Sequence, residues 1–189
     1  MDHATLAPSA WIARFAHLVP ANAHVLDLAA GHGRHARLFA SRGARVLAVD
    51  RDAAALATFA GVQGIETMIA DLETGAWPLG DVRLDAIVVA NYLHRPLFPH
   101  LVRALADDGV LLYETFAVGN ERFGRPSNPD FLLRAGELLD VVRGWLTVVA
   151  FEQGEVAGER PAVVQRLAAV GPKQPWPPAI GAGESPFPG

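Results

Sequence analysis

Five short apolar runs recur along the first part of the chain, and several of them show no alternation of polar and apolar positions. They occupy His24 to Leu28, Arg45 to Val49, Ile65 to Ala70, Leu84 to Ala90 and Gly109 to Tyr113. A strand that is buried on both faces has this pattern, and such strands occur in parallel sheets. The runs therefore predict five parallel strands.

Segments with helical spacing separate several of these runs. They occupy Arg34 to Ser41, Asp52 to Ala60 and Leu97 to Ala106. Ser9 precedes an earlier periodic stretch that stops at Pro20, which predicts a capped first helix. The link from Asp71 to Arg83 has little room for a helix, so we predict an irregular crossover there. Strands that alternate with helices indicate a doubly wound α/β sheet.

The last third of the chain has a different pattern. Asp130 to Val142 reads as a helix, and Trp145 to Gln153 and Pro161 to Val170 read as two strands with a short link. A short link predicts an antiparallel pair. From Gly171 onward Pro and Gly dominate and apolar residues are few, so residues 171–189 are predicted to be a disordered or loosely attached tail. Residues 1–170 then form a single domain.

Composition narrows the class of protein. Of 189 residues, 51% are hydrophobic, which suffices for one sizeable core. The formal net charge of -4 does not favour nucleic acid or an anionic membrane as a partner. Asp2 and His3 stand where a signal peptide would be basic, and no apolar run approaches the ~20 residues that span a bilayer. We expect a cytoplasmic protein.

Metal and thiol chemistry are not expected. Cysteine is absent, which excludes disulfides and thiolate ligands. His32 and His35 have i, i+3 spacing, but no third ligand stands at a suitable distance along the chain.

A glycine-rich turn follows the first predicted strand. Asp27 lies inside that strand, and Gly31 and Gly33 precede the helix that begins at Arg34. Glycines let a ligand approach the backbone, and the start of a helix offers unpaired amides.

Acidic residues then end the next two strands. Asp50 is placed to accept hydrogen bonds from both hydroxyls of a ribose. Asp71 is placed to accept from an adenine amino group while the Leu72 amide donates to a ring nitrogen. The three acids in this order indicate a nucleoside site.

With these residues the chain resembles the class I S-adenosylmethionine-dependent methyltransferases over nearly all of Ala21 to Val170. The segments Tyr113 to Phe116, Gly119 to Pro126 and Asn128 to Pro129 resemble small bacterial enzymes of the tellurite-resistance type. The resemblance implies S-adenosylmethionine as cofactor and a Rossmann-like seven-stranded sheet of order 3-2-1-4-5-7-6, with strand 7 antiparallel. The cofactor-binding residues that it implies are Asp27, Ala29, Gly31, Gly33, Asp50, Arg51, Asp71, Leu72 and Asn91.

Ala29 departs from the family pattern, because many relatives have glycine at the first position of the turn. A methyl group there costs little if the backbone dihedrals are ordinary, but it obstructs a ligand that packs on that Cα.

The residues that follow the fourth and fifth predicted strands are the candidates for contact with the methyl acceptor. Tyr92 and Glu114 are the candidate catalytic residues, and Arg95, Phe123 and Arg125 are further candidates on the same side. An acid at the end of a buried strand must be used or paired. Glu114 therefore either acts on an acceptor or holds an arginine.

Two further residues, Arg122 and His94, complete the acceptor hypothesis. Arg122 and Arg125 are the arginines considered as partners of Glu114, and His94 and Arg95 either cap the next helix, face water or reach the acceptor. The long segment from Ala117 to Pro129 is predicted to be a flap over the acceptor pocket.

Two other functions stay open on the sequence alone. Gly31, Gly33 and Ala36 also satisfy the dinucleotide fingerprint G-x-G-x-x-A, which would suit an NAD-dependent oxidoreductase. Asp27 argues against that function, because the first strand of a dinucleotide fold runs apolar into the turn. A noncatalytic nucleoside-binding protein is the second alternative. For a methyltransferase we expect a small-molecule acceptor, whose identity the sequence does not give.

Overall fold

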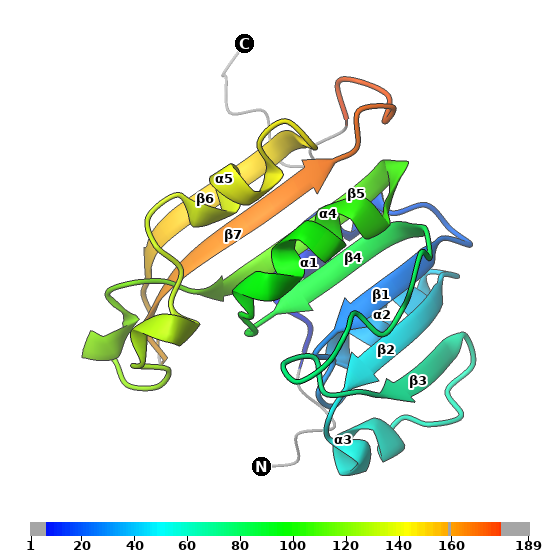
Figure 1. Cartoon of the computed structure of the whole chain (residues 1–189), viewed down its shortest axis with the longest axis horizontal. Coiled ribbons are helices and arrows are strands. Elements are labelled where there is room, and N and C mark those ends of the chain that lie inside the picture. Colours follow the sequence, from blue (N-terminus) through cyan, green and yellow to red (C-terminus); the bar gives the residue numbers. More distant parts are fainter. Residues whose placement is uncertain (1–6, 159, 179–189) are drawn as a thin grey trace.

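A central seven-stranded sheet organises the chain in the computed structural model, which describes residues 7–158 and 160–178 (Figure 1). The strands are β1 (His24–Leu28), β2 (Arg45–Asp50), β3 (Ile65–Ile69), β4 (Leu84–Ala90), β5 (Leu105–Phe116), β6 (Thr147–Val156) and β7 (Ala162–Val170). Their order is β3-β2-β1-β4-β5-β7-β6, and β7 pairs antiparallel with both of its neighbours. The predicted order and the reversed seventh strand are confirmed.

Helices cover both faces of this sheet (Figure 1). They are α1 (Ala10–Phe15), α2 (Arg34–Ser41), α3 (Ala53–Ala57), α4 (Phe98–Ala104) and α5 (Glu137–Val142), with single 3-10 turns at Ala16–Leu18, Arg95–Leu97, Asn120–Arg122 and Pro129–Phe131. Side chains of α1, α2 and α3 pack into one hydrophobic cluster, and those of α4 and α5 pack into a second cluster on the opposite face. The arrangement is the predicted doubly wound α/β sheet.

The predicted first helix is confirmed together with its cap. The Ser9 hydroxyl accepts from the backbone amides of Trp11 and Ile12, at 3.2 and 3.4 Å. Trp11 and Phe15 are buried under the sheet, with ring centroids 4.6 Å apart. The cap starts the helix where its apolar face begins, so α1 covers the sheet from its first turn.

The helix predicted from Asp130 to Val142 is wrong in its first half. Only α5 is helical there, after a 3-10 turn and an extended stretch. In that stretch the Leu133 amide donates to the Phe116 carbonyl, and the Val118 amide donates to the Leu133 carbonyl. These pairings to distant backbone outweigh local helical preference, and Gly136, with φ of 70°, starts the helix later.

The crossover from Asp71 to Arg83 contains no helix, as predicted. Trp77 and Leu79 from this link pack on the hydrophobic cluster of α4 and α5. The fifth strand is longer than predicted, because Leu105 still pairs with Leu84 although the next residues are charged.

The first residues after β7 bond to the start of β5. The Gly171 amide donates to the Gly109 carbonyl at 2.8 Å, and the Lys173 amide donates to the Asp107 carbonyl at 2.9 Å. Residues 179–189 of the predicted tail lie outside the described residues. Within the described ranges, no helix has the length and apolar character that a bilayer span requires.

Candidate active site

A cavity of about 280 Å³ opens where β1, β2, β3 and β4 end. Parallel strands bring their carboxyl ends to one edge, which is where open α/β sheets bind ligands. The lining residues are Ala29, Asp50, Arg51, Ala70, Asp71, Leu72, Glu73, Asn91 and Tyr92. Six of the nine predicted cofactor-binding residues line this cavity, whereas Asp27, Gly31 and Gly33 do not.

Asp27 lies behind the cavity. Its side chain is only 1% exposed, and its Oδ2 accepts from the Ala36 amide at 2.8 Å. This bond fastens the first turn of α2 to the middle of β1. Burial raises the pKa of Asp27 to about 7, although the bond from Ala36 acts in the opposite direction. Asp27 therefore shapes the turn and does not line the cavity.

The two glycines of the turn have different tasks. Gly33 has φ of 73°, and a Cβ there would lie 2.7 Å from the Phe59 ring, so packing requires glycine. A Cβ on Gly31 would meet nothing within 4 Å. Gly31 thus leaves open space beside its backbone, which fits a site that takes a ligand against the turn.

Ala29 has φ of 55°, which is the left-handed region. A methyl group at this position was expected to cost little only if the backbone dihedrals of Ala29 were ordinary, and they are not. The strained residue stays in place because the next amide, that of Ala30, donates to the Val49 carbonyl at 3.0 Å. A left-handed residue with a Cβ costs roughly 1–2 kcal/mol, so glycine would be the relaxed choice at this position.

Asp50 is fixed by two backbone donors. The Gly31 amide donates to Oδ2 at 2.7 Å, and the Asp52 amide donates to Oδ1 at 2.9 Å. An ionised carboxylate has about four acceptor positions, so each oxygen can take one more hydrogen bond. The half-buried carboxylate is held with that remaining capacity at the edge of the cavity. At the next strand end, one Asp71 oxygen accepts from the Glu73 amide at 2.9 Å.

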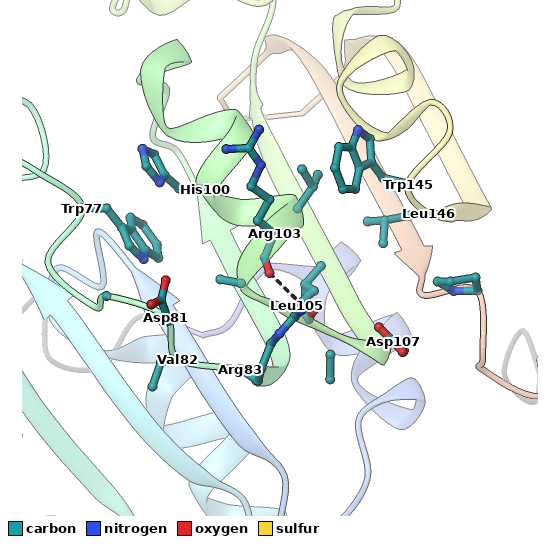
Figure 2. A pocket seen from close by; sticks show the side chains of 15 residues that line it. Trp77, Asp81, Val82, Arg83, His100, Arg103, Leu105, Asp107, Trp145 and Leu146 are labelled. Carbon is teal, nitrogen blue, oxygen red and sulfur yellow. Dashed lines mark hydrogen bonds between the residues drawn. The ribbon is translucent and has the colours of Figure 1, made fainter.

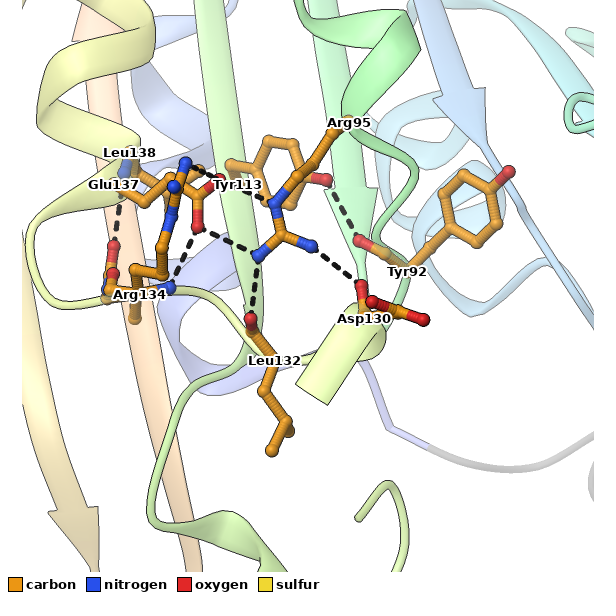
Figure 3. A network of polar contacts seen from close by, with 9 residues as sticks. Tyr92, Arg95, Tyr113, Asp130, Leu132, Arg134, Glu137 and Leu138 are labelled. Carbon is orange, nitrogen blue, oxygen red and sulfur yellow. Dashed lines mark hydrogen bonds and ion pairs between the residues drawn. The ribbon is translucent and has the colours of Figure 1, made fainter. Parts of the chain in front are cut away.

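The backbone after β4 is anchored to β5. The Asn91 amide donates to the Glu114 carbonyl, and the Tyr113 hydroxyl donates to the Tyr92 carbonyl, both at 2.9 Å. Figure 3 shows that the Tyr92 side chain turns away from the neighbouring Arg95. Burial raises the pKa of Tyr92 to about 12, with smaller contributions from Glu73 and Asp71. The phenol therefore stays protonated.

Arg95 is committed to a structural network (Figure 3). Its guanidinium donates to both Glu137 oxygens, at 2.7 and 3.0 Å, and to the carbonyls of Asp130 and Leu132. Burial alone would raise the pKa of Glu137, but hydrogen bonds from Arg95 and Arg134 lower it to about 2. The network ties the segment before α5 to the residues after β4. Sequence reasoning missed Glu137, which stands 42 residues after Arg95.

Glu114 is paired, but not with the arginines expected from the sequence. Its carboxylate accepts from Arg166, which lies directly opposite on β7. Arg122 instead pairs with Glu155 at 3.2 Å. The antiparallel register of β5 and β7 explains the difference, because it sets Glu114 beside Arg166 on the same face of the sheet.

A second cavity of about 350 Å³ lies further along the same edge, at the end of β5 and the start of β7. Its lining residues are Phe116, Asn120, Phe123, Arg125, Arg160, Pro161 and Ala162. Asn120 holds the loop above it, because its side chain donates to the Pro126 carbonyl and accepts from the Val163 amide. Arg125 makes no hydrogen bond or ion pair with any other described residue. Two acceptor-side candidates, Phe123 and Arg125, therefore share one cavity.

A cavity larger than these two lies elsewhere. It measures about 700 Å³ and lies at the opposite edge of the sheet, where β5 begins (Figure 2). Trp77 stacks on His100 there, with ring centroids 5.4 Å apart, and Arg83 donates to the carbonyls of Arg103 and Leu105. None of the predicted site residues lines this cavity. Size alone does not mark the functional site.

His35 has a structural role beside the turn. It is buried, and its Nε2 accepts from the Ser9 amide at 3.2 Å. Burial, with a smaller effect of Arg34, lowers the pKa of His35 to about 3. The ring is therefore neutral and links the start of the chain's first helix to α2. In the parts of the chain that the structure covers, no group of three or more His, Cys, Asp or Glu residues is arranged to hold a metal.

Comparisons with known proteins agree with this geometry. Residues 25–109, which include the ends of β1 to β4, match a family described as a methyltransferase domain. A search of curated proteins found no match. Among solved structures, TehB from Haemophilus influenzae has a TM-score of 0.70 at 16% identity, over 84% of this chain and 61% of its own. The chain thus spans less than two thirds of that protein's length.

Two other solved structures cover most of both chains. An S-adenosylmethionine-dependent methyltransferase from Mesorhizobium loti has a TM-score of 0.63 at 17% identity, over 82% of this chain and 95% of its own. A TehB-like methyltransferase from Corynebacterium glutamicum has a TM-score of 0.58 at 18% identity, over 82% and 84%. The methyltransferase-domain match covers residues 25–109, and the chain shares the fold of these solved structures, including the strand order β3-β2-β1-β4-β5-β7-β6, over more than four fifths of its length.

Proposed function

We propose that the cavity at the ends of β1 to β4 binds S-adenosylmethionine. The observation that carries this proposal is the Asp50 carboxylate, which the Gly31 and Asp52 amides hold in place while acceptor capacity remains on both oxygens. Asp50 would accept the two ribose hydroxyls. Asp71 and the Leu72 amide, at the next strand end of the same cavity, would hold the adenine. Ribose binding by Asp50 and adenine binding by Asp71 and Leu72 account for a single nucleoside. They give no reason to prefer a dinucleotide such as NAD.

The remaining predicted residues complete the cofactor site. The bare Gly31 backbone would face the methionine part, and Gly33 and Asp27 would keep the turn in shape. Arg51, Ala29 and Asn91 line the same cavity. The bound cofactor supplies a methyl group on a sulfonium, which is already a good leaving group. The protein's task is then to align a nucleophile behind the methyl and to exclude water.

For the acceptor, we propose a small anionic molecule that enters the second cavity. Arg125 lines this cavity without a partner among the described residues, and an unpaired guanidinium suits a carboxylate or phosphate. Phe116 and Phe123 supply apolar wall. The segment from Ala117 to Pro129 forms one side of the cavity, so this segment would select the acceptor.

Glu114 is not available as a free base in this arrangement. Its ion pair with Arg166 uses the carboxylate, and Arg166 also contacts Glu152 at 3.3 Å. We propose that Glu114 positions the end of β5 next to the transferred methyl group. An acceptor that is already a nucleophile needs no protein base, which suits an anionic substrate.

Calorimetry tests the cofactor proposal directly. The purified chain should bind S-adenosylhomocysteine, the demethylated cofactor, and should show no comparable heat with NADH. Tight NADH binding without a response to S-adenosylhomocysteine would overturn it. Release of S-adenosylhomocysteine from S-adenosylmethionine with a panel of small carboxylates and phosphates, and none with neutral analogues, would support the acceptor class.

A further inference from the structure

The Tyr92 hydroxyl is the one buried side-chain polar atom without a hydrogen-bond partner in the part of the chain that the structure describes. Buried hydroxyls are nearly always hydrogen-bonded, because an unpaired one loses its bonds to water and gains nothing in return. An isolated exception inside a ligand cavity therefore requires a physical reason.

The position of Tyr92 is not the result of a loose backbone. Its carbonyl accepts from the Tyr113 hydroxyl at 2.9 Å, and the amide of the preceding residue, Asn91, donates to the Glu114 carbonyl. The Tyr113 ring is itself buried and packs edge-on against Phe98, with centroids 6.1 Å apart. The backbone at Tyr92 is therefore held in place by hydrogen bonds to β5.

The side chains that line the cavity around Tyr92 are mainly acidic, and Arg51 is the one cationic residue among them. Three carboxylates, those of Asp50, Asp71 and Glu73, line it together with Tyr92. Burial and the charges of Glu73 and Asp71 keep the Tyr92 phenol protonated. Its hydroxyl can therefore donate a hydrogen bond to an acceptor atom of a ligand in the cavity. An adenosine carries acceptor atoms that the acids cannot satisfy, namely its ring nitrogens and the ribose ring oxygen.

We infer that Tyr92 is a cofactor-contacting residue, whose hydroxyl donates a hydrogen bond to an acceptor atom of the adenosine half of S-adenosylmethionine. This inference rests on the proposed function of the same cavity. It moves Tyr92 from the acceptor side, where its position after the fourth strand had suggested it, to the nucleoside side. Within the described residues the same hydroxyl has no hydrogen-bond partner, so a bond to the cofactor replaces no bond inside the protein.

The substitution Tyr92→Phe separates the effect of the hydroxyl on the stability of the ligand-free chain from its effect on cofactor binding. Tyr92→Phe should leave the melting temperature of the ligand-free chain unchanged or raise it, because an unpaired buried hydroxyl is removed. The same change should weaken binding of S-adenosylhomocysteine about 3- to 10-fold in calorimetry, as expected for one neutral hydrogen bond. 5′-Methylthioadenosine, which lacks the amino-acid part, should lose affinity by the same factor.

Tyr113→Phe is the matched control, because it removes the same atom from the only other tyrosine of the chain. Its hydroxyl has a partner inside the protein, so this variant should lower the melting temperature of the ligand-free chain. Its effect on the affinity for S-adenosylhomocysteine should be smaller than that of Tyr92→Phe.

The outcomes distinguish this inference from the proposed function. If the unaltered chain binds neither probe, the proposed function fails and the inference fails with it. If the unaltered chain binds both probes and Tyr92→Phe binds them equally well, the inference alone is overturned. A loss confined to S-adenosylhomocysteine would also overturn it, because the contact would then lie with the amino-acid half.

Discussion

Asp27 and His35 are buried on either side of the glycine-rich turn, and burial displaces their pKa values in opposite directions. The pKa of Asp27 rises from 3.8 to about 7, and that of His35 falls from 6.5 to about 3. A raised carboxyl pKa gives stability that is present below pH 3.8 and is lost as the pH rises toward 7. A depressed histidine pKa gives stability that is present above pH 6.5 and is lost as the pH falls toward 3. Between about pH 4 and 6.5 the two dependences oppose one another.

If either Asp27 or His35 is replaced, the pH dependence of stability that comes from the other residue should become visible. Asp27→Asn should become more stable relative to the unaltered chain as the pH rises from about 4 to 6.5, by about 1 kcal/mol per pH unit. His35→Gln should show the opposite trend, since it retains only the Asp27 ionisation. Urea unfolding at several pH values measures both slopes. Variants whose stability curves run parallel to that of the unaltered chain would show that neither group titrates as described.

Ala29→Gly should stabilise the chain by about 1 kcal/mol, because the residue has φ of 55° and glycine adopts that conformation without strain. The measurement is the free energy of unfolding of the ligand-free chain. Ala30→Gly, at the next position and outside the left-handed region, is the control and should destabilise by a similar amount. A loss of stability in both variants would mean that the turn does not adopt the strained conformation in solution.

Asp50→Asn should weaken binding of S-adenosylhomocysteine by about 2 kcal/mol, roughly 30-fold, because a neutral amide replaces a charged acceptor of two ribose hydroxyls. Asp52→Ala is the control. It removes the N-cap of α3, whose carboxylate accepts from the Ala54 and Ala55 amides. It should therefore lower stability by about 1 kcal/mol with little change in affinity. Equal affinities of Asp50→Asn and the unaltered chain in calorimetry would remove Asp50 from the ribose site.

Arg125→Ala and Phe123→Ala should reduce methyl transfer to an anionic acceptor at least 10-fold and leave the affinity for S-adenosylhomocysteine nearly unchanged, because both residues line the second cavity. Arg122→Ala is the matched arginine control. Its side chain is exposed and already paired with Glu155, so its loss should affect turnover much less. If Arg122→Ala and Arg125→Ala have the same effect, the second cavity is not the acceptor site.

Much of the fold was predictable because its signals are local. The predicted limits of β1, β4 and α2 agree with the structure, since each is a short apolar or periodic run between turn residues. The acids Asp50 and Asp71 were placed at one edge because parallel strands must end together there.

What the sequence did not show depends on distant partners or on backbone angles. Glu114 meets Arg166 through the register of two strands, 52 residues apart, and no local pattern encodes that register. Leu133 is extended because it bonds to the end of β5, although the segment around it has helical spacing. The strained conformation of Ala29 follows from the tight turn between β1 and α2, and residue type gives no indication of it.

The reversed β7 has a consequence for how the protein is made. β5 lies in the interior of the sheet, but its partner β7 follows every other described strand along the chain, so β7 leaves the ribosome after them. Until residues 162–170 emerge, the long apolar β5 has an open edge with unpaired amides and carbonyls, which is the kind of surface that joins other nascent chains. The pairing also links residues more than fifty positions apart, which makes it slow. Premature termination before β7 should therefore yield aggregates and not a smaller soluble domain, even though every residue of the proposed cofactor site would be present.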